Sequence, residues 1–166
     1  MQHDVFRYLA LDHKRLEGLL EKATLRRGII DPVPYAEFRK GLLRHIGLEE
    51  KILFPALGQL SGGLSDAAAG KLRLDHGALV ALLVPPPSPG IIATIRSVLD
   101  RHNALEEGKG GVYELAGHLT TDAAEAILRK MRELPDVPVV PHNPRPEVLV
   151  ATRRAVERAG YVLQEP

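Results

Sequence analysis

A pair of segments that occurs twice in the chain is the feature that most constrains its fold. The segment LDHKRLEGLL at 11–20 matches LDHGALVALL at 74–83, and HIGLEE at 45–50 matches HNALEE at 102–107. In both copies the first segment precedes the second. A unit of two helices is therefore used twice, and we expect four long helices.

Hydrophobic periodicity supports this reading over residues 1–118. Apolar residues recur at helical spacing in four stretches, which are separated by segments rich in glycine and proline. We expect Pro55 to kink the second helix near its end, and GKGG at 108–111 to weaken or bend the fourth. Short connections between long helices predict an all-α protein, an antiparallel up-down-up-down four-helix bundle.

Residues 119–166 lie beyond this predicted bundle. A short helix is expected at about 121–134, opened by a capping box at Asp122. Four prolines spaced by three, which match the turn of polyproline II, predict an extended arm; they are Pro135, Pro138, Pro141 and Pro144. A last helix at 146–159 would either pack back on the bundle or form a homodimer.

Histidines and glutamates recur at the same positions of the two copies. Each copy carries one histidine on its first helix and a His-x-x-x-Glu pair on its second. These residues are His13, His45, Glu49, His76, His102 and Glu106. Residues four apart in a helix lie roughly 40° apart and one turn along, so each pair can direct two side chains at one point. Leucines within one turn of each histidine place all four on the inward face.

Burying these six groups without partners would be strongly unfavourable, and a bound cation is the simplest compensation. The chain has no cysteine, so only nitrogen and oxygen ligands are available and iron–sulfur clusters are excluded. The six suit two iron ions, each with two histidines and both glutamates bridging; one six-coordinate ion is the alternative. Manganese or zinc could substitute. The Glu-x-x-His pattern of ferritin-like proteins and the HExxH of metalloproteases do not occur at these histidines.

Four charged residues adjacent to the six in sequence are interpreted as supporting or surface residues rather than as ligands. Glu50 and Glu107 are rotated roughly 140° from the histidines of their motifs, which favours hydrogen bonding or a surface position over ligation. Asp12 and Asp75 precede histidines in both copies, where they either orient an imidazole on a neighbouring helix or contribute surface charge.

The remaining candidates lack a counterpart in the repeat. Glu17 lies four residues after His13, but Val80 occupies the matching position of the second copy, so we expect a solvated residue or a neighbour of the ligands. Three further histidines are expected not to be ligands, namely His3, His118 and His142.

The motifs LDH, HIGLEEKILFP, LDH and HNALEE resemble those of hemerythrin-like proteins, the family of HHE cation-binding domains. The resemblance covers about residues 1–118. It implies a four-helix bundle around a non-heme di-iron centre that has an open position for dioxygen. Oxygen-carrying hemerythrins have a fifth histidine one turn before the ligand on the third helix, and Leu72 occupies that position here.

Charge and hydropathy restrict the partners. A net charge of +1 gives no long-range basic field for nucleic acid or anionic lipid. No apolar run approaches the roughly 20 residues of a membrane span, and the first 15 residues carry charges where a signal peptide is apolar. We expect a cytoplasmic protein whose partner is a small molecule, with no nucleic acid and no membrane.

Three functions remain open from the sequence. The nitrogen-rich ligand set favours a protein that binds dioxygen, or nitric oxide, for sensing, storage or delivery. A di-iron or di-manganese redox enzyme acting on peroxide or nitric oxide is the alternative, because the missing fifth histidine leaves the metals more open. An iron-sensing regulatory module is the third, with the proline arm and last helix as its output.

Overall fold

The computed structural model describes residues 4–164, and all regular secondary structure in this range is helical, as predicted. The elements are α1 (Asp4–Ala23), α2 (Pro32–Leu48), the π-helical turn η1 (Glu49–Leu53), α3 (Phe54–Gly58), α4 (Asp66–Leu82), α5 (Pro89–Glu107), the 3-10 helix η2 (Val112–His118), α6 (Thr121–Glu133) and α7 (Pro146–Arg158). The four long helices of the repeat are α1, α2, α4 and α5.

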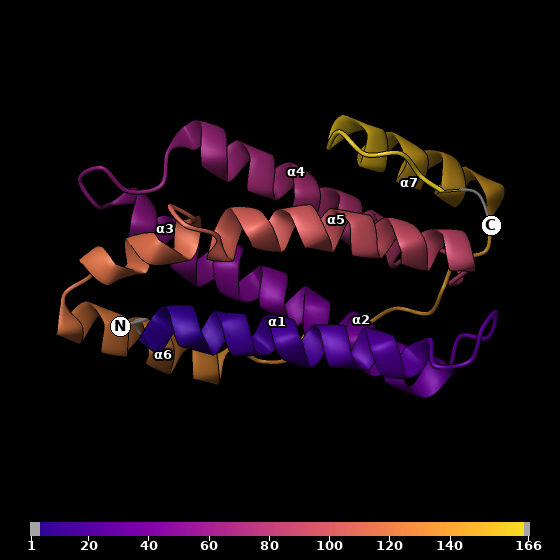
Figure 1. The fold of residues 1–166 in the computed structure, drawn as a ribbon, viewed down its shortest axis with the longest axis horizontal. Helices are drawn as coiled ribbons and strands as arrows, with labels where there is room; N and C mark the ends of the chain where they lie inside the picture. Colours follow the sequence, from indigo (N-terminus) through magenta and orange to yellow (C-terminus); the bar gives the residue numbers. More distant parts are fainter. Residues whose placement is uncertain (1–3, 165–166) are drawn as a thin grey trace.

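These four helices all run roughly along the long axis of the molecule (Figure 1). Helix α1 packs against α2, and α4 packs against α5, so each copy of the repeat forms a helix pair. The two pairs meet where α1 contacts α5. Helix α6 lies against α1 near its N-terminal end, and α7 lies along α4 (Figure 1).

Side-chain caps define where several helices begin. Each cap accepts a hydrogen bond from a backbone N–H of the first turn; the caps are Asp31 for α2, Ser65 for α4, Ser88 for α5 and Thr120 for α6. The predicted capping box at Asp122 is therefore wrong by two residues. Asp122 lies inside the first turn of α6, where the positive end of the helix dipole stabilises its negative charge.

The second helix continues through Pro55 by widening its turn. The N–H of Phe54 donates to the carbonyl of Glu49, which is the five-residue spacing of a π-helix. Pro55 has no N–H, and its ring crowds the carbonyl four residues earlier, so a wider turn before it relieves the clash. Just before Pro55, where the kink was expected, the structure has a π-helical turn that begins at Glu49.

The glycine-rich segment after α5 ends this helix rather than bending it. Helix α5 stops at Glu107, and Gly110 adopts a φ of 76°, which a residue with a side chain rarely does. The expectation that GKGG would weaken or bend a continuing helix is therefore wrong, because the helix ends before this segment. The turn leads into η2, which places the buried side chain of Tyr113 in the core.

A polar layer separates two apolar clusters in the core. One cluster includes Leu16, Leu42, Leu79 and Val98. The other includes Leu9, Leu48, Leu72 and Phe54. Along α1, α2 and α4 the repeated histidine lies between a leucine of one cluster and a leucine of the other. The histidines therefore occupy one level of the fold, surrounded by apolar side chains.

The segment after α6 folds back along the molecule. Residues 134–145 contain neither helix nor strand. The guanidinium groups of α2 hold this arm, because Arg44 donates to the carbonyl of Leu134 and Arg39 to that of Val140, each at 3.1 Å. Helix α7 then packs on α4, as one of the two sequence interpretations expected. The homodimer through this helix stays a prediction.

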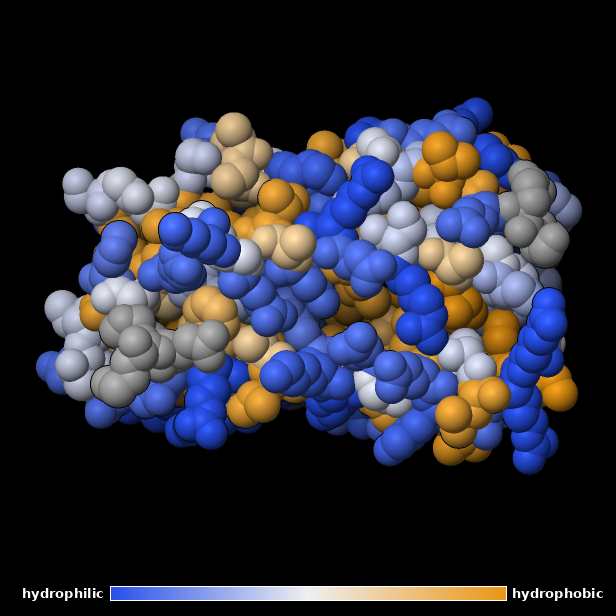
Figure 2. All heavy atoms as spheres, viewed as in Figure 1, coloured by the Kyte–Doolittle hydropathy of each residue, from blue (hydrophilic) through white to orange (hydrophobic). Residues whose placement is uncertain are grey.

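The face shown in Figure 2 is covered mainly by polar and charged residues, with hydrophobic residues in small groups among them. No helix in residues 4–164 combines the length and the apolar character needed to cross a membrane.

Candidate metal centre

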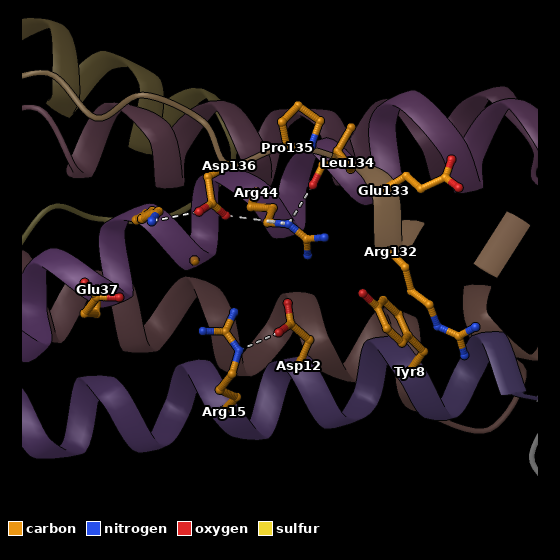
Figure 3. Close-up of a pocket in the computed structure, with 12 residues that line it drawn as sticks. Tyr8, Asp12, Arg15, Glu37, Arg44, Arg132, Glu133, Leu134, Pro135 and Asp136 are labelled. Atoms are coloured by element: carbon orange, nitrogen blue, oxygen red, sulfur yellow. Dashed lines mark hydrogen bonds and ion pairs between the residues drawn. The ribbon is translucent and has the colours of Figure 1, made fainter. Parts of the chain in front are cut away.

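A surface pocket of about 710 Å³ adjoins the centre of the molecule without containing the predicted ligands. Figure 3 shows its charged lining, in which Arg15 pairs with Asp12 at 2.7 Å. None of the six predicted ligands lines this pocket. Its link to the interior is Asp12, whose other carboxylate oxygen lies 2.8 Å from His45 Nδ1.

All six predicted ligands lie together in the buried polar layer. Every one of them is at most 6% exposed. They come from five elements: His13 from α1, His45 from α2, Glu49 from η1, His76 from α4, and His102 and Glu106 from α5. The convergence predicted from the repeat is therefore present, and these residues could hold a metal.

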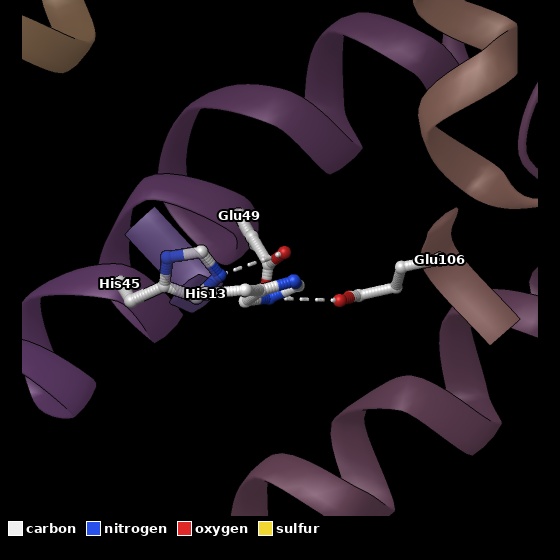
Figure 4. A group of neighbouring side chains, drawn as sticks. All are labelled: His13, His45, Glu49 and Glu106. Atoms are coloured by element: carbon white, nitrogen blue, oxygen red, sulfur yellow. Dashed lines mark ion pairs between the residues drawn. The ribbon is translucent and has the colours of Figure 1, made fainter. Parts of the chain in front are cut away.

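One group of four side chains forms what we call the first half-site. His13, His45, Glu49 and Glu106 offer ligand atoms that lie within 4.8 Å of one another (Figure 4). His45 Nε2 is 3.3 Å from Glu49 Oε1, and His13 Nε2 is 3.5 Å from Glu106 Oε2. Ligands at about 2.0–2.2 Å from one ion lie roughly 3–4 Å from each other, so this spacing suits one cation.

A second group of four, the second half-site, shares both glutamates with the first. Glu49, His76, His102 and Glu106 also lie within 4.8 Å of one another. His76 Nε2 is 3.0 Å from Glu49 Oε2, and His102 Nε2 is 3.1 Å from Glu106 Oε1. The two histidine nitrogens are 3.2 Å apart.

Each shared carboxylate divides its oxygens between the half-sites. Glu49 turns Oε1 to His45 and Oε2 to His76. Glu106 turns Oε2 to His13 and Oε1 to the histidine of its own motif. A carboxylate in this position can bridge two cations, one in each half-site.

A second ring of carboxylates surrounds the histidines. Every repeated histidine directs Nε2 inward and Nδ1 outward to one carboxylate. The pairs are His13 with Glu107 at 2.5 Å, His45 with Asp12 at 2.8 Å, His76 with Glu50 at 2.7 Å, and His102 with Asp75 at 3.4 Å. Such partners fix the ring orientation and make the inward nitrogen a better metal ligand.

These pairs decide between the interpretations that the sequence left open. Asp12 and Asp75 orient the histidine on the next helix of their own copy. Hydrogen bonding was one of the two roles expected for Glu50 and Glu107. Each of these glutamates pairs with the histidine on the first helix of the other copy. The aspartates therefore join helices within each copy, and the glutamates join the two copies to each other.

The surrounding charges change the protonation of two histidines. Burial by itself lowers the pKa of His45, but the charge of Glu49 and the hydrogen bonds with Asp12 and Glu49 outweigh it and raise the pKa to about 10. The same balance, with Glu106 and an aspartate as partners, raises the pKa of His102 to about 10. Without metal, both side chains are imidazolium ions at neutral pH.

The two inner glutamates differ in protonation because they face each other. Burial and the charge of Glu49 raise the pKa of Glu106. Burial also disfavours the charge of Glu49, but His45 and His76 outweigh it and hold its pKa well below the usual range. Glu106 Oε1 is buried and faces Nε2 of His102 at 3.1 Å. Two buried carboxylates that face each other are an environment that a bound cation would stabilise.

We expect the metal-free protein to lose stability as the pH rises from about 6.5 to about 10. The pKa values of His45 and His102 are raised to about 10 in the folded state, against about 6.5 in the unfolded chain. Their stabilisation is fully present below pH 6.5 and is lost as the pH passes through 10. Urea unfolding of chelator-treated protein across this range measures the effect. A free energy of unfolding that stays constant or rises would contradict it.

Tyr113 is a group at the first half-site that sequence reasoning missed. Its hydroxyl lies 3.2 Å from His13 Nε2, 3.4 Å from His45 Nε2 and 3.1 Å from Glu106 Oε2, and it donates a hydrogen bond to Glu49 Oε1. The repeat could not reveal it, because it follows the glycine turn that ends α5 and the first copy has no such turn.

Other candidates lie away from the cluster. Glu17 is exposed, which agrees with the expectation of a solvated residue. Leu72, at the position of the fifth histidine of oxygen carriers, is buried in an apolar cluster. His118 and His142 are not part of either half-site. His3 lies outside the described residues.

Comparisons with known proteins do not assign this chain to a family. No protein-family description matches it, and no curated protein or solved structure is significantly similar to it. The case for a metal centre therefore rests on the buried cluster of histidines and glutamates.

Proposed function

We propose that this chain is a hemerythrin-like, non-heme di-iron protein that binds dioxygen or nitric oxide for sensing, storage or delivery. The observation that carries the proposal is the division of the Glu49 and Glu106 oxygens between the two half-sites. Two cations that share two carboxylates and take two imidazoles each would use every inward-facing atom of the cluster.

In this proposal the four repeated helices form an up-down-up-down bundle with the metals at its middle. The two apolar clusters above and below the histidines support this arrangement, because they exclude water from both ends of the polar layer. Residues 119–166 are then an appendage whose arm and last helix pack on the outside of α2 and α4.

The donor set fits iron better than metals that prefer oxygen ligands. Imidazole suits iron, whereas magnesium and calcium prefer carboxylate, carbonyl and water oxygens. Neutral imidazoles also stabilise the ferrous state more than additional carboxylates would. Iron would supply the electrons for reversible binding of the small ligand, while the protein holds Nε2 of each histidine inward through the outer carboxylates.

A mainly apolar pocket of about 300 Å³ supports the proposal that the ligand is small and uncharged. Its lining includes Leu64, Leu72, Leu105, Val112 and Leu115. Leu72 lies one turn before His76, and Val112 precedes Tyr113, so two lining residues are neighbours of the cluster along the chain. Dioxygen and nitric oxide partition into such an environment more readily than charged substrates do.

Exposure of the reduced, iron-loaded protein to air tests the proposal. We expect absorption bands that appear in air and disappear when the sample is flushed with nitrogen. The variant His76→Ala should lose this reversible change, because it removes a nitrogen from the second half-site. His118→Ala, which removes a histidine outside both half-sites, should keep it.

Other outcomes of the same experiment would contradict the binding function. Irreversible bleaching with formation of a product would indicate a redox enzyme acting on peroxide or nitric oxide. The absence of bands, combined with melting that depends on metal, would indicate an iron-sensing module.

A further inference from the structure

We infer that Tyr113 is a metal ligand of the first half-site alone, so that one of the two metals has a phenol oxygen ligand and the other has none. This inference rests on the proposed dinuclear centre and adds a seventh protein ligand to it. The second half-site then keeps only its two histidines and the shared glutamates, and its metal is the one with an open position for the small ligand.

The position of the phenol oxygen carries the inference. It lies at 3.1–3.4 Å from three ligand atoms of the first half-site and hydrogen-bonds to the fourth. Ligands at right angles on one metal, each at about 2.1 Å, are roughly 3 Å apart, so this oxygen has the spacing of an additional ligand. No hydrogen bond links it to either histidine of the second half-site within residues 4–164.

The ring of Tyr113 is held in place independently of its hydroxyl. It stacks on His13 with centroids 5.6 Å apart and meets the edge of Phe6 at 5.7 Å. The preceding turn is tightly fixed, because a Cβ on Gly111 would lie 2.5 Å from the carbonyl oxygen of Glu106. A side chain positioned in this way loses little further freedom when it binds a metal.

The second half-site has an aromatic ring without an oxygen. Phe54 stacks on His76 with centroids 5.8 Å apart and an interplanar angle of 5°. Tyr113 covers His13 and Phe54 covers His76, so the two half-sites differ in whether the covering ring offers a ligand atom. This difference breaks the symmetry that the repeat imposes on the other ligands.

Coordination replaces the phenol O–H bond with a metal–oxygen bond and releases one proton to solvent. Tyrosine oxygen is an established iron ligand in proteins. Ferric phenolate complexes absorb visible light by charge transfer from the ligand to the metal. Resonance excitation of that band enhances the vibrations of the phenolate ring, which histidine and carboxylate ligands do not have.

The test is resonance Raman spectroscopy of the protein loaded with ferric iron, combined with iron analysis. We expect wild-type protein to hold two irons and to show phenolate modes. Tyr113→Phe should still hold two irons but lose both the modes and the visible band. Tyr35→Phe is the matched control, because Tyr35 is equally buried and its hydroxyl has no hydrogen-bond partner among residues 4–164, and it should keep both signals.

Each other result decides against one of the two proposals. Wild-type protein with two irons and no phenolate modes would overturn the role of Tyr113 and leave the dinuclear centre standing. Phenolate modes that persist in Tyr113→Phe would also overturn it. Wild-type protein that holds one iron or none would overturn the dinuclear centre itself. If Tyr113→Phe fails to fold, the wild-type spectrum alone still decides.

Discussion

Removal of the proposed metal ions is expected to lower the melting temperature by roughly 8–16 °C. A metal present at about a thousandfold excess over its dissociation constant stabilises the folded state by about 4 kcal/mol. In a chain of this size each kcal/mol shifts the melting temperature by about 2–4 °C. The physical cause is the buried cluster, in which the charge of Glu49 acts on the facing Glu106 and raises the pKa of that carboxyl.

Calorimetry before and after chelation, with metal analysis of both samples, measures this effect. Addition of metal to the chelated protein should restore the original melting temperature. Glu49→Ala should show a much smaller response to chelator, because it removes a ligand of both half-sites. An unchanged melting temperature after verified loss of metal would contradict the expectation.

In the proposed dinuclear centre, loss of a bridging glutamate is expected to reduce the metal content from two ions per chain toward one or none. Glu49 and Glu106 each supply an oxygen to both half-sites, so Glu49→Ala or Glu106→Ala weakens both metals at once. Without the bridge, two like-charged cations also lie close together with less negative charge between them.

Neighbouring glutamates provide the matched controls for this expectation. Glu50→Ala and Glu107→Ala should keep two metals at saturation, with an affinity lower by about 10–100-fold, because these side chains only orient His76 and His13. Iron analysis at increasing metal concentration separates the two classes. If Glu107→Ala empties the centre while Glu106→Ala leaves it filled, the ligand register on α5 is shifted by one residue.

The inner ligands could be predicted from the sequence because the repeat places the same groups on the same helical face twice. Spacing of four residues and flanking leucines are local properties, and the structure brings all six residues together. The repeat also identified Asp12 and Asp75 as candidates. Which imidazole each aspartate contacts depends on helix packing, so the sequence left orientation and surface charge as alternatives.

Features that depend on breaks in helical periodicity were not predictable in the same way. Tyr113 reaches the centre only because α5 ends at Glu107 and a left-handed glycine turns the chain back. The π-helical turn at Glu49 arises from Pro55, whose effect was expected as a kink. The cap of α6 is Thr120 rather than Asp122, because the Thr120 side chain accepts the hydrogen bond from the N–H of Ala123 and the helix begins two residues earlier than the capping box indicated.

The most direct test of the dinuclear centre is a crystal structure of the iron-loaded protein with anomalous diffraction measured at the iron absorption edge. We predict two anomalous peaks inside the buried layer, one contacting His13 and His45 and the other contacting His76 and His102, with Glu49 and Glu106 between them. A single peak among the six side chains, or iron found only at the surface, would contradict the account.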